Sequence, residues 1–512
     1  MRKTLIVFLA LALVCACGAA VCTHAVAAPR EDVTFDEHVF AGDPAAAAGL
    51  QVQLQAALRQ NLFWDSTVCF SGRDYTADTA FRFSPVAVSR EQPRQYSGVE
   101  VDTRVNVWTD SDTNPFGYGR AYQEILDTLE PGQTGTKVIR VADYYDEYPL
   151  WFSVDLPHLF ITTLDSWDDH DAYATDAERD AIHALRDFFR IPVLPDEYVE
   201  LQIDKNIDGS SSSYGVSSVQ QGDRYWPSSE SVVTDDACFF RLSNRTENGK
   251  LVDMSRIPGG YGIYILPYVQ SEADSFPDTY LCADQLACFF PLDPAVEIRH
   301  LGLTPDRSAL VLHTVENNIY YVTLIDVKTA AVLQKLAVMD DFTDEDYTNI
   351  TETDDFTCIR VSERRICVLT QEADGRFRVA LTSDFDSELP FAVAYSSISE
   401  MAFDGERLAL VRNDETVLVN GAESTKRYLA GSTAGLITED GTYVDNCGFT
   451  VAVFDASGLA YYGGYCSSLE DVRLLRELSG QKRAQFASRP ATGAAAAEEE
   501  LPGISRQGES GL

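Results

Sequence analysis

The sequence predicts an all-β protein made of repeated antiparallel sheets, with a few inserted helices. Three observations lead to this prediction. Short apolar strands alternate with polar Asp/Gly/Ser/Asn turns, the turns recur every roughly 40 to 60 residues, and the arrangement fills about 170 residues from Val296 to Ser468. The chain has 512 residues, more than one small core needs, so we expect several domains or one large repetitive architecture.

Three turns in this part of the chain, each with the strand that follows it, can be superimposed. They are TPDRSALVL from Thr304, VSERRICVL from Val361 and FDGERLALV from Phe403, which are 57 and 42 residues apart. A fourth unit, GFTVAVFDASGLAYYGGY, begins at Gly448 and turns at Asp455-Ala456-Ser457-Gly458. The repeat resembles a β-propeller blade without tryptophan-aspartate dipeptides, so the predicted fold class is β-propeller-like.

The rest of the chain divides by composition. Residues 33–196 are β-rich with helical insertions, and we favour further blades of the same propeller over a separate α+β domain. Residues 197–474 contain the propeller-like repeats, and the Ala/Glu/Gly/Ser-rich tail at 475–512 is expected to be disordered. Helices are predicted at 119–132, at 469–480 and at 175–190, where Thr175 and Glu178 form a capping box.

The N-terminus predicts an export signal over residues 1–27. Arg2 and Lys3 precede an apolar run from Leu5 to Cys22, and Ala27 ends a small-residue cleavage site. Two alternatives stay open: acylation of Cys17, or retention of the uncleaved run as an anchor. Each of the three places the body of the protein outside the cytoplasm, secreted or attached to the cell envelope. We expect membrane contact only through this signal or lipid anchor.

The formal net charge of −39 excludes one class of partner. Nucleic-acid binding requires Lys and Arg to neutralise phosphates, so DNA and RNA are not expected to bind. The same charge favours solubility and attracts cations or basic partners.

Eleven cysteines fall into a leader set and a mature set of eight. An even count in an exported chain predicts disulfides, with buried reduced thiols as the alternative. Two pairs flank predicted hairpin turns, one pair encloses a short loop, and the last pair follows by elimination. These pairs are Cys447–Cys466, Cys358–Cys367, Cys282–Cys288 and Cys69–Cys238.

The stretch DKNIDG is the strongest candidate for a metal site. Asp204, Asn206 and Asp208 offer oxygen ligands at alternate positions, as in the first half of an EF-hand loop. The twelfth position, however, is Gly215 and not glutamate, and the flanking residues alternate like strands. A hairpin with this stretch in its turn is the favoured interpretation, and a weak calcium site is the alternative. No other cofactor is expected.

No serine elbow, P-loop or HExxH motif is present. His300 and His313 both lie in a repeat, where they either project into a propeller channel or have a structural role. Tyrosine-rich stretches, including YYGGY at Tyr461 to Tyr465, could form a sugar- or peptide-binding surface, although core packing explains most of them.

The segments Ser231 to Tyr268 and Glu37 to Leu50 resemble those of uncharacterised exported proteins of Gram-positive bacteria. The resemblance implies an envelope location and a propeller-like body, and it transfers no functional residue. The leading hypothesis is an extracytoplasmic binding or scaffold protein for a protein or glycan. The alternative is a propeller enzyme, a metal-assisted hydrolase or lyase acting on a polymer. Convergence of carboxylates or histidines from different blades would remove the preference for a binding protein.

Overall fold

The computed structural model describes most of the chain, and it divides into two compact units. Unit 1 contains residues 1–91, 363–366 and 380–512, and unit 2 contains residues 92–362 and 367–379. The described residues are 12–18, 21, 31–58, 62–84, 96–103, 124–143, 145–148, 150–162, 176–207, 211–218, 223–271, 278–343, 346–362, 364–385, 400–414, 448–468, 473–474 and 484–486.

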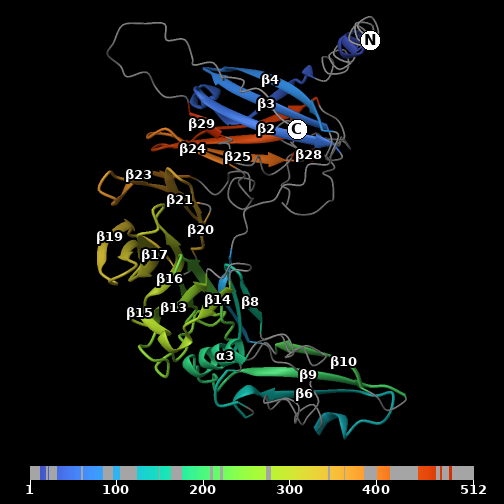
Figure 1. Cartoon of the computed structure of the whole chain (residues 1–512), viewed down its shortest axis with the longest axis vertical. Coiled ribbons are helices and arrows are strands. Elements are labelled where there is room, and N and C mark those ends of the chain that lie inside the picture. The colour runs from blue at the N-terminus through green and yellow to red at the C-terminus, as the bar shows by residue number, and fades with distance from the viewer. Residues whose placement is uncertain are drawn as a thin grey trace, which may run out of the picture. The chain divides into compact units, whose positions relative to one another are not determined.

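Unit 1 contains two antiparallel sheets that share one core. In the first, the order is β1-β27-β26-β25-β24, so a strand near the N-terminus completes a sheet made of C-terminal strands. The second has β2, β3 and β4, with β28 and β29 both pairing with β2 (Figure 1). The strands are β1 (Phe35–Gly42), β2 (Leu50–Leu58), β3 (Leu62–Ser71), β4 (Asp74–Phe83), β24 (Glu400–Phe403), β25 (Leu408–Asp414), β26 (Gly448–Asp455), β27 (Gly458–Ser467), β28 (Arg473–Leu474) and β29 (Ala484–Phe486), with the short helix η1 (Pro44–Ala47).

Unit 2 contains a succession of antiparallel sheets, and the fourth of them also includes residues assigned to unit 1. The sheet orders are β5-β7-β8, β11-β12-β13 with β14 and β15 on β13, β16-β17-β18-β19, and β20-β21-β22-β23. The strands are β5 (Gly98–Thr103), β7 (Leu150–Leu156), β8 (Leu159–Thr162), β11 (Ser229–Val233), β12 (Ala237–Leu242), β13 (Gly262–Ser271), β14 (Asp278–Leu281), β15 (Ala287–Pro291), β16 (Glu297–Leu303), β17 (Ala309–Glu316), β18 (Ile319–Asp326), β19 (Val332–Met339), β20 (Thr348–Glu352), β21 (Phe356–Val361), β22 (Arg365–Gln371) and β23 (Phe377–Asp384).

These sheets confirm the all-β, propeller-like fold class, because four-stranded meanders follow one another along the chain. The structure also corrects the phase of the predicted repeat. TPDRSALVL and FDGERLALV connect the first and second strands of their sheets, whereas VSERRICVL connects the second and third, β21 and β22. The true counterpart begins at Thr353. Thr304, Thr353 and Asp404 are 49 and 51 residues apart, a far more even spacing.

A threonine explains why this turn recurs. The Thr304 amide donates to the Ala309 carbonyl at 3.0 Å, and its hydroxyl accepts from the Ala309 amide at 3.1 Å. Thr234 makes the same pair of bonds with Ala237, and Thr353 makes it with Phe356. The threonine therefore closes the turn between the first and second strands of three successive sheets.

An insertion in unit 2 carries the long helix. Its sheet has the order β10-β9-β6, and α3 precedes β9 (Figure 1). Helix α3 confirms the helix predicted at 175–190, and it buries Ala181, Ile182 and Leu185 because these residues share one face. The elements are β6 (Thr134–Arg140), α3 (Asp176–Phe188), β9 (Tyr198–Lys205) and β10 (Ser211–Ser218), with the short helices η2 (Val141–Asp143) and η4 (Ala283–Gln285) elsewhere in unit 2.

Two expectations for the C-terminal region are wrong where the structure describes it. Arg473 and Leu474 form β28 within the predicted helix at 469–480, and Ala484–Phe486 form β29 within the predicted disordered tail. Both pair with β2, whose hydrogen-bonding groups are otherwise open at that edge. Ala484 is buried in the unit 1 core, which anchors this strand.

The predicted export signal is described only in part. Residues 12–18 are helical, and Cys17 lies exposed within them. Across the residues with described positions, no helix has the length and apolar character needed to cross a bilayer. Cleavage after Ala27 and acylation of Cys17 remain predictions.

Candidate functional site

The first strands of successive sheets in unit 2 lie side by side. Strand β11 contacts both β5 and β16. The Ser231 hydroxyl accepts from the Val99 amide at 3.0 Å and donates to the Val99 carbonyl at 2.9 Å, so side-chain bonds join β11 to β5. The side chains of β11 are all half-buried. This is the position that innermost strands take in propeller blades.

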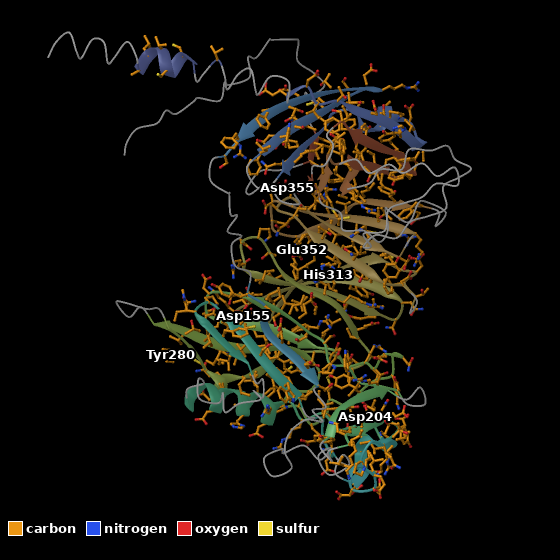
Figure 2. The ribbon with its side chains drawn as sticks, turned by 90° about the vertical axis from the view of Figure 1, so that its right-hand side faces the viewer. Asp155, Asp204, Tyr280, His313, Glu352 and Asp355 are labelled. Atoms are coloured by element: carbon orange, nitrogen blue, oxygen red, sulfur yellow. The ribbon has the colours of Figure 1, made fainter. Side chains whose placement is uncertain are left out.

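Charged groups from three sheets converge on His300. Its Nδ1 lies 2.5 Å from Oε1 of Glu230 on β11, and its Nε2 lies 3.4 Å from Oε1 of Glu352 on β20. Arg241 on β12 contacts the other oxygen of Glu230 at 3.2 Å, and the ring centroid of His313 is 5.3 Å from that of His300. We call Glu230, Arg241, His300, His313 and Glu352 the His300 cluster (Figure 2 labels His313 and Glu352).

Equivalent positions in the repeat supply these residues. Arg241, His313 and Arg360 each stand four residues after the residue that closes the turn to the second strand. In the strand register, Glu230 is opposite Arg241 and His300 is opposite His313. A charged or ionisable residue therefore recurs at one position of a mostly apolar second strand. The sequence contains this signal, but the misplaced repeat phase hid it.

The charges in the cluster stabilise one another. Burial alone would lower the pKa of His300, but the hydrogen bond to Glu230 and the close contact with Glu352, together with the charges of both carboxylates, outweigh it and raise the pKa to about 9. Burial would raise the pKa of Glu230, yet His300 and Arg241 hold it below its usual value. Burial and the charge of His300 keep the pKa of His313 well below its ordinary value. At neutral pH, His300 is thus a cation and His313 is neutral.

The Nε2 atoms of His300 and His313 are buried, and the charges of the His300 cluster are balanced. Nε2 of His300 is buried, and its contact with Glu352 is longer than a normal hydrogen bond. The Glu352 carboxylate lies directly against Gly302, in space that a Cβ at position 302 would occupy. His313 is fully buried, with Nδ1 bonded to the Tyr320 hydroxyl at 3.0 Å. Proton transfer to a ligand would require Glu352 to move away from His300.

A pocket of about 410 Å³ lies in unit 1. Within it, Oε1 of Glu37 accepts hydrogen bonds from the hydroxyls of Tyr461 at 2.9 Å and Tyr465 at 3.0 Å. The two hydroxyls are themselves 2.6 Å apart, and both tyrosines are fully buried, which raises the pKa of each. We call this the Glu37 pocket; its lining is Val33, Thr34, Phe35, Glu37, Arg73, Asp74, Tyr75 and Ala77.

Core tyrosines thus hold one residue of the pocket lining, Glu37, through their hydroxyls. Tyr461 and Tyr465 do not form the exposed aromatic surface considered above, because both are buried in the core of unit 1. Tyr75, whose ring is edge-on to Tyr465 at 5.4 Å, is half-buried and lines the pocket. Burial raises the pKa of Tyr75, and the nearby charges of Glu37 and Asp36 raise it further. Contacts with buried core residues therefore hold the pocket wall in place before a ligand binds.

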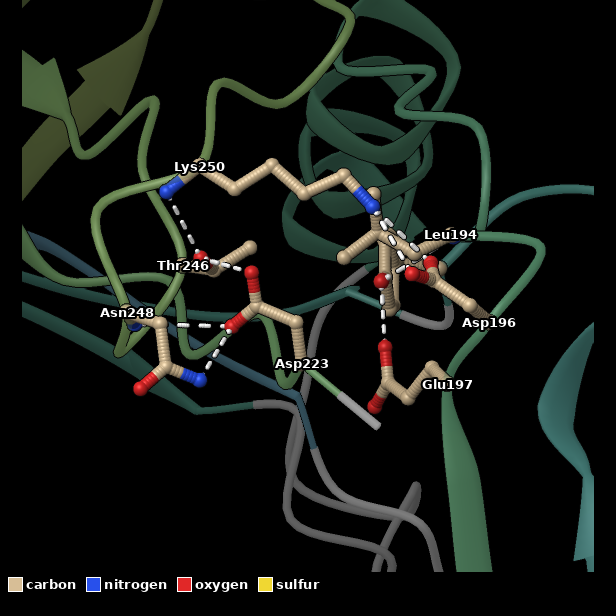
Figure 3. Close-up of polar contacts among 8 residues, drawn as sticks. Leu194, Asp196, Glu197, Asp223, Thr246, Asn248 and Lys250 are labelled. Carbon is tan, nitrogen blue, oxygen red and sulfur yellow. Dashed lines mark hydrogen bonds and ion pairs between the residues drawn. The ribbon is translucent and has the colours of Figure 1, made fainter. Parts of the chain in front are cut away.

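A third polar cluster joins loops of unit 2 (Figure 3). The hydroxyl of Tyr148 donates to buried Glu197, and burial raises the pKa of Glu197. Lys250 pairs with Asp196 at 2.9 Å, and the Thr246 hydroxyl donates to Asp223 at 2.6 Å. These bonds hold the chain around 194–197 to the loops at 223 and 246–250, which is a structural role.

The chain was compared with known proteins at the level of sequence and of structure. No family model matches it, and no curated protein matches it. Among solved structures, a protein from Lactobacillus plantarum matches with 11% identity and a TM-score of 0.23, covering 83% of this chain and 98% of that one. A periplasmic gluconolactonase from Pseudomonas aeruginosa matches with 10% identity and a TM-score of 0.25, with the same coverages. TolB from Acinetobacter baumannii matches with 11% identity and a TM-score of 0.15, covering 70% and 82%.

These TM-scores are too low to carry an inference about activity or ligand. The fold class rests on the sheets themselves, and no comparison supports the likeness to exported Gram-positive proteins.

The DKNIDG stretch forms the hairpin that we favoured. Lys205 pairs with Ser211 across β9 and β10, and the Thr134 hydroxyl on β6 donates to Asp204 at 2.5 Å. Asn206 follows β9, and Asp208 lies outside the described residues. In the described part of the chain, no group of three or more His, Cys, Asp or Glu side chains is arranged to hold a metal ion. The calcium site at Asp204, Asn206 and Asp208 remains a prediction.

Three of the four predicted disulfides are not present. Cys69, Cys238, Cys282 and Cys288 are free thiols. Cys282 and Cys288 lie opposite Pro267 and Tyr264 of β13, three residues apart, which is roughly 10 Å along a strand and too far for a disulfide.

The Cys69–Cys238 link, reached by elimination, would join the two units, and no disulfide joins Cys358 to Cys367. Burial is the main cause that raises the pKa of Cys238 and of Cys358 to about 12. Buried reduced thiols, the alternative considered above, describe Cys238 and Cys358, whereas Cys69 is half-buried.

The fourth link, Cys447–Cys466, remains a prediction. Cys447 lies outside the described residues, as does the side chain of Cys466. The hairpin around it is confirmed, because Asp455 pairs with Gly458 and Gly448 pairs with Cys466.

Proposed function

We propose that this protein is an extracytoplasmic binding protein whose ligand site is the Glu37 pocket. The export signal predicted over residues 1–27 supports the location. The observation that carries the function is an open pocket in which a carboxylate is held in place by two buried tyrosine hydroxyls. A polar group fixed by the core in this way keeps its geometry before the ligand arrives, which reduces the entropic cost of binding.

The preference for binding cannot rest on an absence of convergent groups. Convergence of carboxylates or histidines from different blades was the observation expected to remove that preference, and the His300 cluster meets the condition with residues from three sheets. The proposal rests instead on the contrast between the His300 cluster and the Glu37 pocket. In the His300 cluster each charge has a protein partner, and Nε2 of His300 is buried. In the Glu37 pocket, side chains remain open to a ligand.

The convergence favours a second candidate, a propeller enzyme using His300 as a general acid. Glu230 at Nδ1 would orient the ring, and Nε2 would deliver the proton once Glu352 moved. A pKa of about 9 makes the imidazolium a weak acid at neutral pH, which is unfavourable for this role. Turnover of a polymer that is lost in His300→Gln, with the fold intact, would favour the enzyme over the binding protein.

The experiment for the binding proposal uses the full mature chain and a panel of glycans, peptides and small cations. Binding is followed by NMR on protein labelled at tyrosine, and each hit is repeated with Tyr75→Ala, which removes a pocket wall. We expect at least one hit that weakens by about tenfold or more in the variant. Hits that are all indifferent to Tyr75→Ala would contradict the pocket as the ligand site.

A further inference from the structure

We infer that the Glu37 pocket recognises a protonated amine, such as the side chain of a lysine in a basic partner. This inference rests on the proposed function and names the chemical class of the ligand group. It goes beyond the binding role because an acidic pocket of the same shape could instead take a neutral polyhydroxylated ligand.

The balance of charge in the pocket favours a cation. Glu37 and Asp74 both line it, and no described cationic side chain forms an ion pair with either. The one basic residue of the lining, Arg73, pairs with Asp43 at 3.0 Å outside the lining, and this contact holds the pKa of Asp43 below its usual value. Among the described residues, two carboxylates of the lining are therefore left without a cationic partner. A monocation replaces part of the missing charge, whereas an anion would be repelled.

The hydrogen-bonding pattern favours a donor. Oε1 of Glu37 already accepts from Tyr461 and Tyr465, which leaves Oε2 as the oxygen without a partner among the described residues. An ionised carboxylate oxygen only accepts hydrogen bonds. An ammonium group offers three donors and no acceptor, so it fits an opening where acceptors predominate.

The aromatic ring of Tyr75 in the pocket wall also favours a cationic ligand. The Tyr75 hydroxyl is committed to the Phe35 carbonyl, which fixes the ring at the pocket wall beside Glu37. A ring next to carboxylates is the composition that attracts organic cations, since the ring face and the carboxylates both carry negative potential. A bare metal ion is disfavoured in comparison, because calcium requires six to eight oxygens.

The test compares two probes that differ at the side-chain amine, which is charged in one and acetylated and neutral in the other. One is N-acetyl-lysine amide, and the other is the same molecule with its side-chain amine acetylated. Binding to the full mature chain is measured by NMR of the tyrosine signals at low and high salt. We expect the charged probe to bind at least about tenfold more tightly than the neutral one, and the advantage to fall as salt screens the carboxylates.

Three variants locate the effect. Glu37→Gln and Asp74→Asn should each weaken the charged probe by about tenfold, and Asp78→Asn, an exposed carboxylate on the same strand outside the pocket, should leave it unchanged. Asp74 is exposed, so its variant keeps the test valid even if Glu37→Gln disturbs the buried tyrosines.

The outcomes separate the two proposals. Equal binding of both probes, or no effect of the pocket variants on the charged one, overturns the amine inference. If a neutral glycan then binds in a manner that depends on Tyr75, the binding function stands without it. If no ligand depends on the pocket, both proposals fail.

Discussion

The His300 cluster of unit 2 and the Glu37 pocket of unit 1 both hold a carboxylate against fixed partners. They differ in how much charge and hydrogen-bonding capacity remains without a protein partner. Glu230 and Glu352 face the cations His300 and Arg241, so the charges of the cluster are paired with one another. In the described part of the chain, the hydrogen-bond partners of Glu37 are the neutral hydroxyls of two tyrosines. The difference teaches that convergence of titratable groups does not by itself mark a ligand site. A ligand site is better marked by charge and hydrogen-bonding capacity that the protein does not use.

Removing the central cation of the His300 cluster is the most direct test of the contrast between that cluster and the Glu37 pocket. His300→Gln leaves Glu230 and Glu352 close together without the imidazolium, so we expect the free energy of unfolding to fall by roughly 2 to 3 kcal/mol. The size is limited because the His300 side chain is 24% exposed. Chemical denaturation at pH 7 measures the loss. His183→Gln, on the exposed face of α3, is the matched control, and an equal effect of both variants would show that the cluster has no special role.

The pH dependence of stability sharpens the same contrast. Because folding raises the pKa of His300 to about 9, its contribution is complete below its unfolded pKa and is lost as pH rises through 9. We expect a loss of about 2 kcal/mol between pH 7 and pH 10, after allowing for partial exposure. Glu230, with its pKa lowered, acts in the opposite direction and loses its contribution in acid. The alkaline loss should be absent in His300→Gln; a loss of the same size there would assign it to other groups.

The cluster can also be opened without changing a charged residue. Gly302→Ala places a Cβ where the Glu352 carboxylate lies, so the carboxylate must move away from His300. We expect a loss of about 1 to 2 kcal/mol and a lower pKa of His300, read from the NMR titration of its ring. Glu352→Gln should lower that pKa in the same direction. An unchanged pKa in both variants would mean that Glu352 does not act on His300.

The smallest expected effect concerns the turn that sets the repeat. Thr353→Val removes the hydroxyl that closes the turn from β20 to β21, and we expect a loss of about 1 kcal/mol in thermal or chemical unfolding. Thr351→Val, in the half-buried middle of β20, is the control and should change little. If the two variants cannot be distinguished, the threonine does not define the repeat.

Much of the fold could be predicted from the sequence because period-two patterning and turn residues are local signals. The hairpins at Asp204 and at Asp455, and helix α3, follow from such signals. The repeat phase could not be fixed in this way, since VSERRICVL and TPDRSALVL are both a polar turn before an apolar strand. Only the register of the sheets separates them.

The two sites were harder to predict because their residues meet through tertiary structure. Glu230, His300 and Glu352 are far apart in the sequence, and the convergence of His300 with them depends on first strands lying side by side. Glu37 meets Tyr461 and Tyr465 because β1 pairs with β27, a contact between the two ends of the chain. The sequence pointed to His300 and to the YYGGY stretch, but not to their partners. β29 was missed because three residues are too few for a periodic signal.

The most direct test of the account is an NMR titration of the mature chain with N-acetyl-lysine amide, following tyrosine and histidine rings in one sample. The contrast between an open, uncompensated pocket and a closed, balanced cluster predicts that signals of Tyr75, Tyr461 and Tyr465 shift with the probe while those of His300 do not. Shifts at His300 with unmoved pocket tyrosines would contradict it and place the ligand at the His300 cluster.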